Sequence, residues 1–173
     1  MTERPASLEP AVAGEGRSAP MEQIKLLYTV FLGLLLATGI GIGIAAFYAA
    51  PSPPPAPESI SSPEGKVEPE EARRHELEYR RYEAKSETYN RNVSTIAVAF
   101  SVVLLAISMA GLKNLPIIAN GLMLGGVFTL IYGIVRSFGS GEQKFMFVIV
   151  LVGIVATLAL GYVRLMKPAE QPS

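Results

Sequence analysis

The residues with the clearest chemical potential lie together in a charged segment near the middle of the chain. His75, the single histidine, has Glu71 four residues before it and Glu78 three residues after it. On a helix these side chains share one face, as carboxylate and imidazole metal ligands would. A closed site needs further ligands, and the chain has neither a cysteine nor a second histidine. We interpret the three residues as a solvated charged face.

The sequence offers no other starting point for catalysis. It contains no nucleophile motif, phosphate-binding loop or zinc signature, so we predict no catalytic, cofactor-binding or metal-binding residue. Fifteen Lys and Arg residues balance fifteen Asp and Glu residues, which leaves no overall field to attract nucleic acid. The expected partners are therefore the lipid bilayer and other proteins.

Four long apolar stretches determine where any functional side chain of this protein can lie. Half of the 173 residues are apolar and only 17% are charged. Each stretch has about the 20 residues that cross a hydrocarbon layer about 30 Å thick, and none keeps the polar face that a long helix of a soluble protein would show. The sequence predicts an all-α fold, a four-span transmembrane helix bundle. The predicted transmembrane helices are 24–50, 92–112, 115–135 and 144–166.

The interior of these stretches carries no ionisable residue of the kind that marks pumps and transporters. Among the uncharged polar residues, Asn120 would be the most expensive to leave unpaired in lipid. We expect it to hydrogen-bond across the hairpin formed by the second and third spans, with Ser108 as the nearest candidate.

The two ends of the chain are predicted to be tails. Residues 1–23 are rich in Pro, Ala, Gly, Ser and Glu, a composition typical of disorder, and residues 167–173 form a short C-terminal tail. Translation from Met1 and from Met21 are both compatible with the sequence. The first apolar run exceeds the roughly 7–15 residues of a signal-peptide core, so we expect a retained membrane anchor.

A long connection joins the first two spans. Residues 51–68 are a Pro-rich spacer, and 69–91 are predicted to form a charged helix continuous with the second span, because no Gly or Pro lies between Pro69 and that span. Tyr79, Tyr82 and Tyr89 recur at helical spacing along it. One interpretation is a docking face for a partner or a second copy. In the other, Tyr89 lies at the lipid headgroups, and Tyr79 and Tyr82 are solvated or fold back on the spacer.

Small residues at intervals of four form ridges along the spans. Such ridges let helix backbones approach closely. Because lipid tails are as apolar as leucine, helices in a membrane associate through this close packing and not through the hydrophobic effect. They predict tight helix packing, either within one bundle or between copies. The predicted packing glycines are Gly33, Gly41, Gly121, Gly125, Gly133, Gly153 and Gly161.

The connections and charges predict the topology. Only Lys113 and Asn114 separate the second and third spans, and a short turn follows Arg136, so consecutive helices are expected to be antiparallel neighbours. Four spans place both termini on one side of the membrane. Basic residues near the membrane are almost equally numerous on the two sides, so the first helix decides the prediction. Arg17 and Lys25 precede its apolar run and no basic residue follows it until Lys66, which predicts cytoplasmic termini and the long connection outside.

Three segments resemble parts of small four-helix, multi-span inner-membrane proteins of bacteria that have no assigned activity. They are 26–33, 89–93 and 125–134. The resemblance implies a bacterial inner-membrane location and no catalysis. Our expectation is a non-enzymatic structural or protein-interaction subunit, as a homo-oligomer or in a membrane complex. The alternative is a small oligomeric transporter or channel, and a membrane enzyme is the third choice.

Overall fold

The chain folds into four long helices that are each able to cross a membrane. The computed structural model describes residues 18–55, 69–110 and 115–163, and these contain helices and no strand. The helices are α1 (Ser18–Phe47), α2 (Pro69–Ala110), α3 (Pro116–Ser137) and α4 (Gln143–Gly161), with a short 3-10 helix, η2 (Phe138–Ser140), between the last two. All four long helices have the length and hydropathy of membrane spans. The predicted all-α, four-span fold is confirmed.

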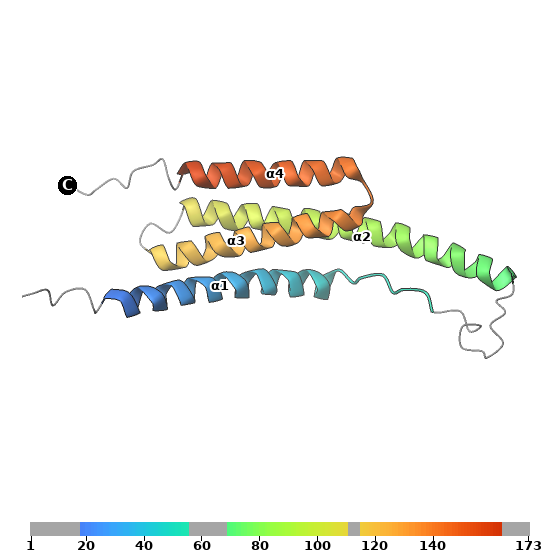
Figure 1. Ribbon diagram of the computed structural model, residues 1–173, viewed down its shortest axis with the longest axis horizontal. Coiled ribbons are helices and arrows are strands. Elements are labelled where there is room, and N and C mark those ends of the chain that lie inside the picture. Colours follow the sequence, from blue (N-terminus) through green and yellow to red (C-terminus); the bar gives the residue numbers. More distant parts are fainter. Residues whose placement is uncertain (1–17, 56–68, 111–114, 164–173) are drawn as a thin grey trace, which may run out of the picture.

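The bundle is built around the pair formed by α2 and α3. Figure 1 shows this pair in the middle, with α1 along one side and α4 along the other. The most apolar part of α2 and of α3 is 39% buried, whereas that of α1 and of α4 is only 11% buried. The two outer helices therefore present most of their surface to lipid. Successive helices run in opposite directions, so the start of α1 and the end of α4 lie at the same end of the bundle (Figure 1).

Helix α2 extends far beyond the other three. Its 42 residues run without a break, a length of about 63 Å at about 1.5 Å per residue, and its N-terminal half projects from the bundle (Figure 1). Pro69 and two acidic residues open the helix, which suits its N-terminus. Exposed pairs Arg80–Glu76 (2.8 Å) and Arg74–Glu70 (3.9 Å) add local support. The predicted continuity of the charged helix with the second span is confirmed.

Several helix ends differ from the predicted boundaries. α1 begins at Ser18, inside the segment 1–23 that was predicted to be disordered, because 18–25 includes good helix formers ahead of the apolar run. It ends at Phe47, and α3 continues to Ser137. The remainder of the N-terminal tail, spacer residues 56–68, the Lys113–Asn114 connection and the C-terminal tail lie outside the described residues.

Candidate functional site

Glycines position α1 against α3. A Cβ atom placed on Gly33 would lie 2.9 Å from the Cβ of Leu124 and 3.1 Å from the backbone nitrogen of Gly125. One placed on Gly125 would lie 3.3 Å from the carbonyl oxygen of Gly33. Gly121 approaches the side chain of Leu32 in the same way. These distances leave no room for a side chain, so the two backbones are in contact through glycine.

Glycines on a second face of α3 receive α2. A Cβ on Gly133 would lie 2.8 Å from Val98, and one on Gly126, which is not among the predicted packing glycines, would lie 2.9 Å from Leu105. On α4, Gly153 faces the flexible end of Ile134 at 3.0 Å. Gly41 and Gly161 differ from these, because nothing within 4 Å would meet a Cβ at either position.

Buried hydroxyl groups complete the contact between α2 and α3. Ser94 donates to the carbonyl of Gly133, and Ser108 donates to the carbonyl of Ala119, both at 2.7 Å. The second bond crosses the hairpin next to Asn120, where the sequence predicted a polar contact. Thr129, also buried, donates to the carbonyl of Gly125 within its own helix. These hydroxyls satisfy their hydrogen bonds inside the protein, as polar groups in lipid must.

A polar and aromatic cluster joins the helices at the end of the bundle where α2 projects. We call it the end cluster; its members are Tyr48, Tyr89, Asn90, Asn92, Tyr132 and Arg136. The rings of Tyr48 and Tyr89 stack with centroids 5.3 Å apart and planes 4° apart. The amide of Asn92 donates to the hydroxyl of Tyr48 at 2.7 Å. This stack ties the end of α1 to α2.

Arg136 holds the other side of the end cluster. Its guanidinium carbon lies 5.4 Å from the centroid of Tyr89 and 5.9 Å from that of Tyr132, within cation–π range. Its NH1 group donates to the Asn90 side-chain oxygen at 2.8 Å, and the Asn90 amide donates to the carbonyl of Gly139 at 3.0 Å. Arg136 thus links α3 to α2, and through Asn90 to η2. Its guanidinium group stabilises contacts between helices and does not face an open pocket.

The predicted tyrosine face is divided by this arrangement. Tyr89 is only 7% exposed because its ring is covered by Tyr48 and Arg136, so it belongs to the end cluster and not to an exposed surface. Tyr79 is 48% exposed. Its ring lies 6.5 Å from that of His75 and 6.2 Å from that of Tyr82, in one row along α2.

Residues 51–55 run beside this row. Four of them border a cavity of about 440 Å³ together with Glu78, Arg81, Tyr82 and Lys85, and these four are Pro51, Ser52, Pro54 and Pro55. Tyr82 is half-buried there, which agrees with the alternative in which this part of the helix meets the spacer. His75 and Tyr79 lie beyond it.

The turn between α3 and α4 contacts α2 as well. Arg91 pairs with Glu142 of this turn at 3.7 Å, instead of with Glu87 one helical turn away. Gly141 has φ 68°, a left-handed conformation that favours glycine, and a Cβ there would overlap the carboxylate of Glu87. The turn is therefore seated closely on α2.

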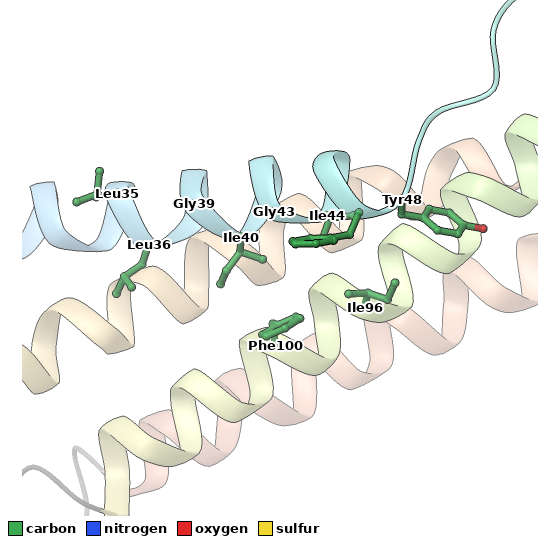
Figure 2. A pocket seen from close by; sticks show the side chains of 10 residues that line it. Leu35, Leu36, Gly39, Ile40, Gly43, Ile44, Tyr48, Ile96 and Phe100 are labelled. Carbon is green, nitrogen blue, oxygen red and sulfur yellow. The ribbon is translucent and has the colours of Figure 1, made fainter.

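An apolar groove of about 530 Å³ separates α1 from α2 below the end cluster. Figure 2 shows Leu36 and Ile40 pointing from α1 into the space between the helices, with Ile96 and Phe100 rising from α2. Gly39 and Gly43 also border it, and nothing within 4 Å would meet a Cβ on either. The groove opens sideways, toward the region that lipid occupies around a membrane span.

The predicted charged face around His75 is spread along the exposed helix. In the part of the chain that the structure describes, no three His, Cys, Asp or Glu side chains come close enough to hold a metal ion. The His75 ring instead lies against Tyr79. A row of rings on a solvated helix is suited to recognising another surface.

The four apolar spans decide the general class. This is a multi-pass membrane protein. No protein family, curated protein or solved structure matches the chain.

Proposed function

We propose that this membrane protein is a non-enzymatic interaction subunit that presents the N-terminal part of α2 to a partner protein. We call residues 69–91 the arm. The observation that carries the proposal is the row of His75, Tyr79 and Tyr82, in which Tyr79 is 48% exposed, on the part of α2 that projects from the bundle (Figure 1).

Toward its N-terminus, the arm receives little stabilisation from its own chain. Its ion pairs Arg80–Glu76 and Arg74–Glu70 have side chains that are more than half exposed, and such pairs contribute only a few tenths of a kcal/mol. Aromatic side chains at helical spacing are the anchors that helices use in a partner's groove, and tyrosine is enriched among residues that dominate binding energy. The arm therefore has the chemistry of a helix that docks by its Tyr79 side.

The proposed location is the inner membrane of a bacterium, with cytoplasmic termini and the arm on the outer side. Lys25 lies just before the apolar part of α1, and residues 48–55 after it carry no charge. The first helix usually sets the orientation through such basic residues. The resemblance of three segments to bacterial inner-membrane proteins supports the same location.

The interaction role is preferred over a small oligomeric transporter or channel. A transport path requires polar groups that face water or substrate. Ser94, Ser108 and Thr129 are buried, and each donates to a backbone carbonyl inside the bundle, which favours a structural use of these hydroxyls.

Site-specific photo-crosslinking in native membranes tests the proposal. A photoreactive amino acid replaces Tyr79 in the full chain, and a matched control replaces Leu77, which is 59% exposed and lies on the opposite side of the helix. We expect a discrete protein adduct from position 79 and none from position 77. The variant carrying Tyr79→Ala and Tyr82→Ala should lose the same partner on co-purification, while Leu77→Ala retains it. Equal adducts from both positions, or unchanged recovery after the tyrosine substitutions, would contradict a docking arm.

A further inference from the structure

The groove between α1 and α2 has the length of one lipid leaflet. Its α1 border runs from Leu35 to Tyr48, about 20 Å at about 1.5 Å per residue, whereas half of a hydrocarbon layer about 30 Å thick is about 15 Å. Tyr48 closes one end and hydrogen-bonds to Asn92. Tyrosine and other polar aromatic groups belong at headgroup level. The groove therefore runs from the membrane surface on the arm side toward the middle of the bilayer.

The volume of the groove identifies the kind of occupant. A transmembrane helix about 10 Å wide needs about 1,500 Å³ over this length, far more than the 530 Å³ present. Over about 20 Å of length, that volume gives a mean cross-section of about 26 Å² for a groove that is open along one side. Carbon–carbon contact distances of about 3.5–4.0 Å give a single hydrocarbon chain a width of about 4–5 Å. One acyl chain can therefore lie along the groove, whereas a helix would have to rest over its open side.

Charged residues continue the same face of α2 beyond the groove. Lys85 lies one helical turn, about 6 Å, above Tyr89, and it borders the neighbouring cavity together with Arg81 and Glu78. Two cations and one carboxylate leave a net positive charge there. This is the level at which the phosphate of a lipid would stand if its chain filled the groove.

We propose that the groove binds one acyl chain of an anionic phospholipid from the arm-side leaflet, with the headgroup at Lys85 and Arg81. A chain leaving bulk lipid gains no hydrophobic driving force, so retention depends on the fit of the groove and on the charge at its end. Gly39 and Gly43 contribute to the fit because they leave the α1 wall without a side chain at these two positions.

Native mass spectrometry of the full chain tests the proposal. The protein is reconstituted in nanodiscs of equal phosphatidylglycerol and phosphatidylcholine, and the lipids retained after release are counted. The variant with Gly39→Leu and Gly43→Leu fills the groove. Gly41→Leu is the matched control, since Gly41 lies on the same helix, has nothing within 4 Å of an added Cβ and does not border the groove. We expect one phosphatidylglycerol on the unaltered chain and on the control, and none on the groove variant.

The headgroup contact is tested by charge removal. Lys85→Gln and Arg81→Gln should each lower the ratio of phosphatidylglycerol to phosphatidylcholine about fivefold, and Arg73→Gln, farther along the arm, should leave it unchanged. Circular dichroism and gel filtration establish that each variant is folded. Equal lipid retention in the groove variant and in Gly41→Leu would overturn the proposal, as would a ratio insensitive to Lys85 and Arg81. A dimer that disappears only in the groove variant would assign the surface to a second copy instead.

Discussion

A pair of glycine substitutions on α1 tests the packing of the bundle directly. Gly33 and Gly41 lie on the same helix, two turns apart. A Cβ on Gly33 would lie 2.9 Å from the Cβ of Leu124 and 3.1 Å from the backbone nitrogen of Gly125, whereas one on Gly41 would meet nothing within 4 Å. Neither of the atoms facing Gly33 can be moved by a side-chain rotation, so α1 and α3 must separate to admit alanine.

The magnitude follows from two opposing effects. Alanine favours helix over glycine by about 0.8–1.0 kcal/mol at both positions, so this contribution cancels in the comparison. Overpacking adds about 1–3 kcal/mol of destabilisation at a site that cannot relax, and it applies to Gly33→Ala alone. The free energy of unfolding of Gly33→Ala should therefore lie about 1–3 kcal/mol below that of Gly41→Ala.

Reversible unfolding in mixed micelles provides the measurement. The free energy of unfolding is obtained by titrating dodecyl sulfate into the folded protein and following helix content by circular dichroism. Gly41→Ala should be as stable as the unaltered chain or more stable. Two variants of equal stability would refute the contact between α1 and α3 through Gly33.

Three further predictions concern the end of the bundle that carries the arm. Arg136→Lys keeps the charge but loses the planar group that faces Tyr89 and Tyr132 and binds Asn90, and it should lower the free energy of unfolding by about 1–3 kcal/mol in the same titration; Lys144→Arg is the control, and no loss would mean that the charge alone suffices. Gly141→Ala should be destabilised by about 1–2 kcal/mol because φ is 68° there, and Gly141→Asn should recover part of that loss; equal stability of all three proteins would contradict the left-handed turn. The chain has no native cysteine, so Glu83→Cys and Glu142→Cys should react with a membrane-impermeant maleimide outside intact cells, and Glu22→Cys only after lysis; the opposite pattern would reverse the proposed orientation.

The spans and the continuous α2 could be predicted because their causes are local. Hydropathy over about 20 residues identifies a membrane helix without reference to its neighbours. The absence of Gly and Pro between Pro69 and the second span likewise indicates that α2 continues into that span. Pro116 lies in the first turn of α3. This position suits proline because the N–H groups of the first turn have no partner within the helix, so a missing N–H costs little there.

The contacts between helices depend on partners that the sequence does not place. From the sequence alone, Tyr89 is expected to be exposed or at headgroup level. In the structure it is covered, because Tyr48, at the end of a different helix, stacks on it. Arg91 has Glu87 at favourable spacing, yet it meets Glu142 because the turn before α4 is seated on α2. Intervals of four along α3 select Gly125 but omit Gly126, since α3 meets α1 on one face and α2 on another.

The distribution of glycine links the packing of the bundle to the proposed lipid site. Glycine weakens a helix by about 1 kcal/mol relative to alanine, and in lipid this loss is offset where backbones come into contact. Gly33, Gly121 and Gly125 gain such contacts, but Gly39, Gly41 and Gly43 have nothing within 4 Å of an added Cβ, and of these Gly39 and Gly43 border the groove. Within a single chain these two residues weaken α1 without a packing benefit. An acyl chain in the groove supplies the missing contact, because it needs the space that any larger side chain at those positions would fill.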